Sequence, residues 1–370
     1  MRILLVTEKN RPSMQQRDGG SRVVETIKEA FKGSLTILQF AQEDYPYQSS
    51  NRFERRIRNA RFIGKKVKEI ESEFTHIIFL HVSMQFGSIE FPLQEELKIW
   101  TFPMFLTPSY EASGEKVPKQ YTELEHGVIK KAKNILTPSY LEKEQLISFY
   151  GADREAIHVV PRGVYTEYLF PKVRNFCKPL RVCSVGSIKP QKNTLGLVRL
   201  FAKICKLYPE AVLQIIGPCQ DHSYERKVME EIKELGLEKH IQLEGYVFPE
   251  NLSQLLEAAH IHLSCSACET FGRSIFETLA LGLPNIAFLK NNAAADFLEG
   301  ASYIRFVDSE KEALLALEEI LDNLSYHSSL AVEVGHLYSD KKLGCMIRAK
   351  IEGDDLNQKQ EEVEYEKELL

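Results

Sequence analysis

Short apolar segments alternate with helical segments along most of the chain, and this alternation constrains the fold more than any other feature. RILLVT near the start and RVCSVGS from Arg181 each lead through a polar or glycine-bearing loop into a helical stretch. Further strand candidates are LTILQF, HIIFLHV, MFLTPS and NILTPS in the first half, and AVLQIIG, IQLEGYV, IHLSCS and NIAFL in the second. Helices are expected in the second half at 194–207, 223–235, 251–259 and 273–282. The pattern predicts a parallel sheet in each half, and so two Rossmann-like α/β domains that face each other across a cleft.

Length and composition are those of a globular protein with two domains. The chain has 370 residues, 44% hydrophobic and 27% charged, and its net charge of −5 gives no indication of nucleic-acid binding. Prolines and polar residues interrupt the periodicity around 157–179. We expect an N-terminal acceptor domain at 1–165, a C-terminal donor domain at 166–330, and a helical tail at 331–370, for which packing against the N-terminal domain is one arrangement.

The cysteines and the chain start favour a cytoplasmic protein. Seven cysteines, an odd number mostly in apolar context, indicate reduced and buried thiols. Cys265 and Cys268 form a C-x-x-C pair, but no second pair follows at ligand spacing, so we expect no metal. Met1 leads directly into a strand-like segment rather than a signal peptide, and no apolar run approaches the roughly 18 residues of a membrane helix. The protein is expected to be soluble, or peripheral at the inner membrane face.

The segment from Ser264 to Ala287, SCSACETFGRSIFETLALGLPNIA, combines an anion cradle with two acids. A strand, a glycine turn and a helix N-terminus bring together backbone N–H groups that lack partners within the helix. Glu269 lies on the turn and Glu277 follows on the helix. Because carboxylates accept hydrogen bonds from hydroxyls, the segment suggests a site for a phosphate-linked sugar or ribose. Two weaker interpretations are a catalytic pair flanking one glycosidic bond and acids that merely favour the helix dipole.

This segment resembles the Glu-x7-Glu motif of retaining glycosyltransferases of family 4, which have the two-domain GT-B fold. The surrounding pattern, Glu-x-Phe-Gly-x-x-x-x-Glu followed by Gly-x-Pro, is more specific than a pair of acids. The resemblance implies that Glu269 binds the hexose of a nucleotide-sugar donor and that Glu277 binds the ribose. It further implies metal-independent transfer of a hexosyl group, most commonly from a UDP-sugar, to a hydroxyl of a glycan, a lipid-linked glycan or another acceptor, as in polysaccharide biosynthesis.

The same resemblance assigns the other donor residues. The loop GSIKPQKN resembles the family's Gly-Arg-x-x-x-x-Lys: Gly186 and Lys192 are in place, but Ser187 stands where the family has arginine. Serine cannot replace a bidentate guanidinium, although Lys189 offers a charge from the same loop. Lys192 is expected to contact the diphosphate and to act with Glu269 as the catalytic pair. The remaining expected donor residues are Gly19, Gly20, Gly217, Tyr246, Val247, Thr270, Phe271, Gly272, Arg273 and Ser274.

The first half is expected to hold the acceptor. Family members often carry a histidine after a later strand of this domain, but FLTPSYEASGEKVP has none and offers Ser109, Tyr110 and Glu111 instead. His81 and His126 are candidates as well, although a lone histidine is more often structural.

A basic segment in the first half is predicted to be an amphipathic helix. It carries eight Lys or Arg between 52 and 68 against one acid, with apolar residues at helical spacing. The favoured interpretation is a solvated helix that packs its apolar side on the sheet. The alternative is attraction of an anionic membrane surface or an acidic acceptor.

Three other functions are compatible with such a sequence. Ser187 and the missing histidine favour a non-catalytic glycosyltransferase-like binding subunit, whereas the intact Lys192, Glu269 and Glu277 argue against it. A sugar-nucleotide epimerase of the same fold would act on the donor without an acceptor. A phosphorylase would need a pyridoxal-binding lysine, for which no signature is visible. Turnover of a nucleotide sugar by the purified protein would separate the enzyme from the binding subunit.

Overall fold

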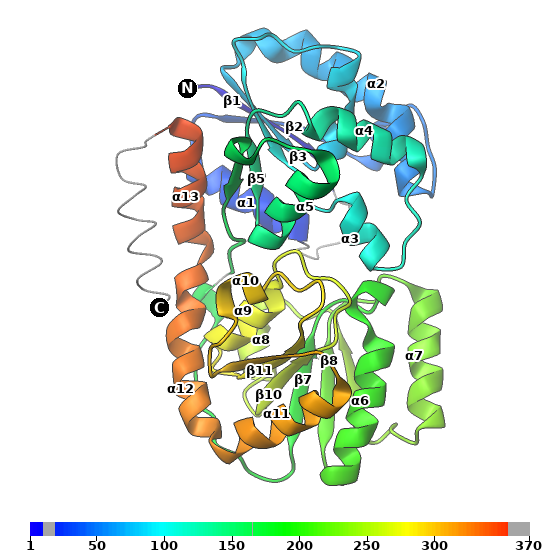
Figure 1. The fold of residues 1–370 in the computed structure, drawn as a ribbon, viewed down its shortest axis with the longest axis vertical. Coiled ribbons are helices and arrows are strands. Elements are labelled where there is room, and N and C mark those ends of the chain that lie inside the picture. The colour runs from blue at the N-terminus through cyan, green and yellow to red at the C-terminus, as the bar shows by residue number, and fades with distance from the viewer. Residues whose placement is uncertain (10–18, 165, 354–370) are drawn as a thin grey trace. The chain divides into compact units, whose positions relative to one another are not determined.

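The structure is a computed structural model that describes residues 1–9, 19–164 and 166–353 (Figure 1). Contacts divide the chain into two compact units. Unit 1 consists of Met1–Glu111, Glu115–Pro161 and the described residues from Leu343 on, and unit 2 of Ala112–Gly114 and Arg162–Lys342. The change of unit after Pro161 lies near the boundary expected after residue 165. The expected tail is divided, because residues 331–342 belong to unit 2 and those from Leu343 on to unit 1.

Unit 1 contains a six-stranded parallel sheet in the order β2-β1-β3-β4-β5-β6. Its strands are β1 Ile3–Glu8, β2 Leu35–Phe40, β3 His76–Leu80, β4 Lys98–Phe102, β5 Ile135–Thr137 and β6 Ile157–Val159. Its α-helices are α1 Gly19–Ala30, α2 Arg52–Ile70, α3 Thr107–Ala112, α4 Lys119–Ile129 and α5 Tyr140–Tyr150. Its 3₁₀ helices are η1 Gln42–Asp44, η2 Glu71–Glu73, η3 Val82–Ile89 and η4 Arg154–Ala156.

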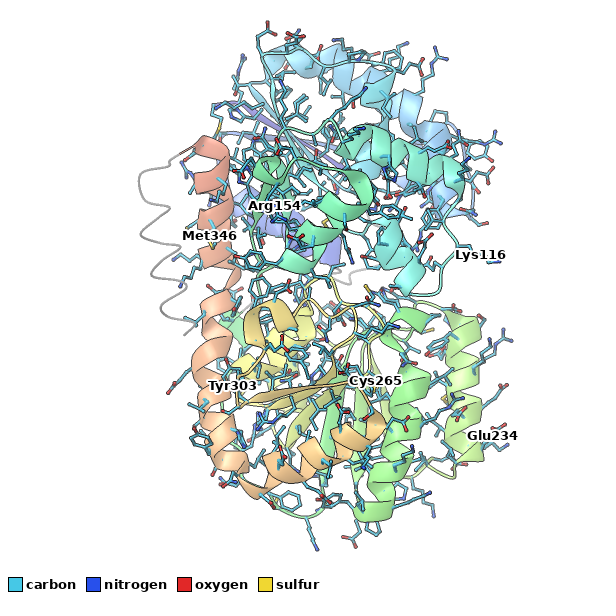
Figure 2. The ribbon with its side chains drawn as sticks, viewed as in Figure 1. Lys116, Arg154, Glu234, Cys265, Tyr303 and Met346 are labelled. Atoms are coloured by element: carbon cyan, nitrogen blue, oxygen red, sulfur yellow. The ribbon has the colours of Figure 1, made fainter. Side chains whose placement is uncertain are left out.

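The central strands of unit 1 are apolar on both sides because helices cover both faces of the sheet (Figure 1). Ile3 and Leu5 of β1 point to a core shared with α1, whereas Leu4 and Val6 point to a core shared with α2. Helix α13 (Asp340–Glu352) adds Ile347 to the first of these cores, where Met346, labelled in Figure 2, also packs. The last described helix of the chain therefore completes the core of the first unit.

One strand prediction in unit 1 is wrong. MFLTPS is not a strand, because β4 is formed by the preceding residues KIWTF and ends at Phe102. Pro103 has no N–H for the sheet ladder, and Met104 adopts a left-handed conformation with φ of 70°. Pro108 then lies in the first turn of α3, where the missing N–H costs nothing.

Unit 2 repeats the architecture with the strand order β12-β11-β10-β7-β8-β9, again all parallel. Its strands are β7 Arg181–Val185, β8 Val212–Ile216, β9 Ile241–Gly245, β10 Ile261–Ser264, β11 Asn285–Phe288 and β12 Ile304–Val307. Its α-helices are α6 Thr194–Leu207, α7 His222–Glu234, α8 Pro249–Leu255, α9 Arg273–Ala280, α10 Ala295–Leu298, α11 Glu310–Asp322 and α12 Leu324–Gly335. Its 3₁₀ helices are η5 Thr166–Tyr168, η6 Pro190–Lys192 and η7 His336–Tyr338.

The four helices predicted in the second half are confirmed to within a few residues, and α6 matches its predicted range. Helix α6 begins where expected because Asn193 caps it, accepting a hydrogen bond from the N–H of Gly196 at 3.2 Å. Two parallel six-stranded sheets confirm the predicted fold class of two Rossmann-like α/β domains.

Within unit 2, the segment that follows the change of unit after Pro161 is hydrogen-bonded to the segment that precedes the change of unit after Lys342. The N–H of Val164 donates to the carbonyl of Tyr338 at 2.9 Å, and the N–H of Asp340 donates to the carbonyl of Val164 at 3.0 Å. A Cβ at Gly163 would lie 2.1 Å from Oδ1 of Asp340, so only glycine permits this approach. Backbone hydrogen bonds therefore hold Val164 next to the start of α13.

Within the described parts of the chain, we find no helix that is both long enough and apolar enough to span a membrane.

Candidate functional site

Two loops at the carboxyl ends of adjacent strands form the candidate site in unit 2. One follows β7 and contains Lys192; the other follows β10 and contains Glu269, and β7 and β10 are paired in the sheet. The N–H of Ala267 donates to the carbonyl of Gln191 at 2.8 Å, and Nε2 of Gln191 donates to the carbonyl of Cys268 at 3.0 Å. These reciprocal bonds fix the loops against each other at the edge where ligands bind in parallel α/β sheets.

An ion pair joins the two predicted catalytic residues. Nζ of Lys192 lies 2.5 Å from Oε1 of Glu269, and the two side chains are only 20% and 8% exposed. Burial alone would raise the pKa of the Glu269 carboxyl, but Lys192 and a hydrogen bond from Ser266 hold that pKa below its usual value. Glu269 is therefore a carboxylate at neutral pH, suited to accept hydrogen bonds, and Lys192 supplies a positive charge beside it.

Two glycines leave room for this arrangement. A Cβ at Gly186 would lie 3.3 Å from Cδ of Lys192, so the lysine stem can lie against the bare backbone. Gly217 follows β8 with φ of 150°, and a Cβ there would lie 2.2 Å from the carbonyl oxygen of Gly186. The predicted glycines at 186 and 217 thus serve close approach of two strand ends.

A third loop supports Glu269 from the other side. Its N–H donates to the carbonyl of Asn291 at 2.8 Å, and its carbonyl accepts from the N–H of Ala293 at 2.9 Å. Gly272 then starts α9 with φ of 84°, and a Cβ there would lie 3.3 Å from that of Ala294. The segment after Pro284 therefore positions the predicted sugar-binding acid through backbone contacts.

Helix α9 begins directly after this turn and carries the second acid. Arg273 and Ser274 are its first residues, where helix N–H groups lack partners within the helix. Glu277 is 7% exposed in the second turn. The ring of Phe271 is buried and stacks on Phe276 at 4.4 Å, so residue 271 could contact a ligand only through its backbone.

The other predicted residues of unit 2 lie on the same edge of the sheet. Ser187 and Lys189 belong to the loop after β7 and are half-buried, as is Thr270 in the loop after β10. Tyr246 and Val247 directly follow β9, and the Tyr246 ring packs edge-on against Phe248 at 5.1 Å. A small cavity lined by Lys192, Ser264 and Ser266, among others, has room for about one water molecule.

A buried polar network under the loops was missed by the sequence analysis. Nε2 of His262 accepts from the N–H of Val185 at 3.2 Å, and its Nδ1 contacts Oδ1 of Asn285. That same oxygen accepts from Oγ1 of Thr278 at 3.2 Å, on α9. Burial lowers the pKa of His262 to about 4, so the ring is neutral at pH 7. The network ties β7, β10, β11 and α9 together, but its members are far apart in sequence.

The predicted residues of the first half belong to unit 1. Gly19 and Gly20 are the first two described residues of α1. Ser109 and Tyr110 are buried on α3, whereas Glu111 is exposed. His126 lies on α4, where its ring packs 4.7 Å from that of Tyr150, in agreement with a structural role.

A cluster of charges at the sheet edge of unit 1 was also missed. Glu8 ends β1 and contacts Arg55 at 3.6 Å and Arg56 at 3.1 Å, both on α2. Arg56 also donates to Oη of Tyr110 at 3.3 Å, and this hydroxyl lies 3.5 Å from Nε2 of His81. The only local signal was the row of arginines in the basic segment.

The basic segment is confirmed as helix α2, and its apolar side is buried. Phe53, Ala60, Ile63 and Val67 are packed inside unit 1. Ion pairs join most of the remaining charges to acids, in the pairs Arg52–Glu115, Arg58–Glu54, Arg61–Glu90, Lys66–Glu69 and Lys68–Glu71. This agrees with the favoured interpretation of a solvated helix packed on the sheet.

The cysteines offer one possible metal group among the described residues. Cys265, labelled in Figure 2, and Cys268 are free and buried, and burial raises the pKa of Cys265 to about 12. Cys219, His222 and Glu225 do place ligand atoms within 4.8 Å of one another, around the start of α7. His222 is 88% exposed, which is typical of a surface group.

Comparison with known proteins gives a family match over part of the chain and a shared fold. Residues 167–329 match the family of glycosyl transferases group 1. The fold is that of GT-B glycosyltransferases. Sucrose-phosphate synthase from Thermosynechococcus elongatus superimposes with a TM-score of 0.77 at 15% identity, covering 95% of this chain and 99% of that one. The Anabaena protein HepE in complex with UDP-glucose gives 0.72 at 15%, covering 96% and 100%.

Relatives in sequence are similar to this chain over part of its length. D-inositol 3-phosphate glycosyltransferase of Nocardia farcinica is 30% identical over 176 residues, 44% of this chain and 39% of that protein. The matches span 37% and 27% of the length of two further relatives. The chain thus spans well under two thirds of the length of these three relatives.

Proposed function

We propose that the protein is a retaining glycosyltransferase that moves a hexosyl group from a nucleotide-diphosphate sugar to an acceptor hydroxyl. The observation that carries the proposal is the Lys192–Glu269 ion pair, in which Nζ and Oε1 lie 2.5 Å apart. The two loops that carry the pair are hydrogen-bonded to each other and lie within the range that matches the group 1 family. The partly buried ammonium of Lys192 can donate hydrogen bonds to a phosphate oxygen, and the buried carboxylate of Glu269 can accept them from a sugar hydroxyl.

Positively charged groups of the site are proposed to bind the diphosphate, and the two carboxylates are proposed to bind sugar hydroxyls. Lys192 contacts the diphosphate, and the first N–H groups of α9 add their dipole, which offsets the charge that develops on the leaving phosphate. Glu269 accepts hydrogen bonds from the hexose hydroxyls, because its lowered pKa keeps it ionised. Glu277 holds the ribose in the same way. In this proposal no protein nucleophile and no metal take part: the acceptor attacks the face that the diphosphate leaves, and a leaving-group oxygen takes the acceptor's proton.

The donor nucleotide is proposed to be UDP. The HepE protein, whose fold is similar, was crystallised with UDP and with UDP-glucose. In this chain the residues after β9, Tyr246 and Val247, are where we propose that the base binds.

The acceptor is proposed to be a glycan, a lipid-linked glycan or a small molecule. The names of three relatives contain a phosphorylated sugar or alcohol: mannosylfructose-phosphate synthase, D-inositol 3-phosphate glycosyltransferase and poly(glycerol-phosphate) alpha-glucosyltransferase. We propose a cytoplasmic location, with attraction to an anionic membrane face as a secondary feature. Such attraction would be electrostatic, since the apolar side of α2 is buried.

A nucleotide-sugar assay tests the proposed function. The purified protein is incubated with a panel of UDP-, GDP- and ADP-sugars, and release of the nucleotide diphosphate is measured together with thermal stabilisation by each compound. One donor should be hydrolysed slowly without acceptor, and Glu269→Gln should abolish this. Glu299→Gln, an exposed acid of the same unit, should not. If no donor were turned over and none raised the melting temperature, the non-catalytic binding subunit would be the better account.

A further inference from the structure

The charges at the sheet edge of unit 1 do not balance. Oε1 of Glu8 lies 3.6 Å from Arg55 and Oε2 lies 3.1 Å from Arg56, so two guanidinium groups share one carboxylate. A third arginine, Arg52, has its own acid in Glu115, so that pair is neutral and changes nothing. The cluster of Glu8, Arg55 and Arg56 carries one surplus positive charge.

This surplus lies largely out of water. The side chains of Arg55, Arg56 and Glu8 are 12%, 13% and 20% exposed. Nε of each arginine is buried and has no hydrogen-bond partner among the described residues. Arg55 otherwise donates only to the carbonyl of Ser49, at 2.9 Å, among the hydrogen bonds of those residues. A partly buried cation whose charge no acid among the described residues offsets is costly, which makes an exchangeable anionic partner favourable.

A neutral hydroxyl completes the group of donors. The N–H of Ser83 donates to Nδ1 of His81 at 3.2 Å, which assigns the ring proton to Nε2, on the side of Tyr110. Oη of Tyr110 thus faces two donors, Nη1 of Arg56 and Nε2 of His81, and its own proton is left for another acceptor. Burial, followed by the charges of Arg56 and Arg52, lowers the pKa of His81 well below its usual value, so this ring adds no charge.

The cluster also occupies the edge at which parallel sheets bind ligands. Glu8 is the last residue of β1, His81 directly follows β3, and Tyr110 lies on the helix after β4. His81 has φ of 84°, a strained conformation for a residue other than glycine, and such strain concentrates at functional sites. The surplus positive charge and the hydrogen-bond donors therefore lie together at the edge of the sheet where ligands bind.

We propose that Arg55, Arg56 and Tyr110 bind a phosphate group of the acceptor. That the phosphate belongs to an acceptor rests on the proposed function; that the cluster binds phosphate does not. Two guanidinium forks and one hydroxyl match the several oxygens of a phosphate ester, and its charge offsets the surplus that Glu8 leaves. Glu8 holds the two forks in place when no phosphate is bound.

Opposite effects of two substitutions test this site. Binding of sn-glycerol 3-phosphate and of UDP is measured by calorimetry at low salt on the full chain. Arg56→Gln should weaken binding of glycerol phosphate about tenfold, the range of one charge-assisted contact. Glu8→Gln should strengthen it several-fold, because a competing carboxylate is removed. Both variants break the same ion pair, so a purely structural role would not produce opposite signs. Arg61→Gln removes an equal charge from the exposed side of α2 and should leave the affinity unchanged.

The outcomes separate the sources of phosphate and the two proposals. If Arg56→Gln lowered the UDP affinity as much as that for glycerol phosphate, the arginines would serve the donor and the inference would be wrong. It would also be wrong if Glu8→Gln weakened glycerol phosphate binding, or if the unchanged protein did not bind it. Donor hydrolysis by the unchanged protein without acceptor depends on unit 2, so its absence would count against the proposed enzyme while phosphate binding could still be measured.

Discussion

The two units place charged side chains at the same edge of the same kind of sheet, but they balance them differently. In unit 2 one lysine meets one carboxylate, and glycines and backbone hydrogen bonds set their loops. In unit 1 two arginines from one helix converge on a single acid. The family match covers 167–329 and so includes only the balanced site. In the two proposals, backbone geometry positions the donor site of unit 2, whereas two long arginine side chains form the phosphate site of unit 1.

Breaking the balanced pair should have the largest effect. Lys192→Ala removes the charge proposed to stabilise the leaving diphosphate and should lower turnover of the donor about 10² to 10³-fold. Because Glu269 and Lys192 act as a unit, Lys192→Ala combined with Glu269→Gln should cost little more than either alone. Steady-state kinetics with the preferred donor measure this. Lys172→Ala, whose pair with Glu257 is solvent-exposed, is the control. Additive losses would show that the two residues act separately.

The requirement for glycine at the same site can be tested by measuring the free energy of unfolding of alanine variants. Gly217→Ala should destabilise unit 2 by about 3 kcal/mol or more, because its Cβ would lie 2.2 Å from the carbonyl oxygen of Gly186 at an unfavourable φ. Gly245→Ala on the adjacent strand also has positive φ but meets no atom within 4 Å, so about 1 kcal/mol is expected. Denaturant unfolding of both variants gives the comparison. Equal losses would mean that backbone conformation alone, not close approach, requires glycine at 217.

Unit 1 should gain stability from a buried acid as the pH falls. Glu125 is fully buried, its Oε1 has no hydrogen-bond partner in the described structure, and burial raises its pKa to about 7. The unfolded chain binds this proton only near pH 4.5, so the folded state is favoured increasingly as pH falls from 7 to 4.5, by about 3 kcal/mol. Glu125→Gln should remove this gain. The single tryptophan, Trp100 on β4, reports the unfolding of unit 1. An unchanged pH profile in the variant would contradict the prediction.

Unit 2 should respond to pH in the opposite direction. His262 has its pKa lowered from 6.5 to about 4 by burial, whereas the unfolded chain takes up this proton near pH 6.5. Stability is therefore lost as pH falls from 6.5 to 4, again by about 3 kcal/mol. His262→Gln cannot be protonated, so its stability relative to the unchanged protein should improve over this range. Hydrogen exchange in peptides from β10 and β11 monitors unit 2 alone. The variant would have to track the unchanged protein at every pH for the prediction to fail.

Several residues predicted for the candidate site of unit 2 lie close together in the structure because they are also close in sequence. Glu269, Gly272 and Glu277 lie within one strand-turn-helix segment, and α6 follows its loop with a cap at Asn193. Local patterns failed where distant residues decide. MFLTPS and NILTPS both contain LTPS, yet NILTPS includes β5 and the cap of α5 at Ser139, whereas MFLTPS leads into α3.

The charge cluster of unit 1 could not be predicted for the same reason. Arg56 meets Glu8, which is 48 positions away in sequence. Periodicity identifies the apolar side of α2, but the sequence does not tell which of eight basic residues turn toward the sheet edge. The buried His262–Asn285 contact, 23 positions apart, shows the same limit in unit 2. Such contacts depend on strand order, which composition and spacing do not specify.

Substitutions on the solvent-exposed side of α2 should have the smallest effect on stability. The exposed charges would then differ from the partly buried Arg55 and Arg56 on the other side of the helix. Arg61 is 75% exposed and pairs with Glu90 at 3.1 Å, so water already satisfies both groups. Arg61→Gln should change the free energy of unfolding by less than about 0.5 kcal/mol, and by less still at high salt. Urea unfolding followed by Trp100 measures this. A loss above about 1 kcal/mol would mean that the outer charges form a supporting network, and that the surplus at Arg55 and Arg56 cannot be treated apart from the rest of the helix.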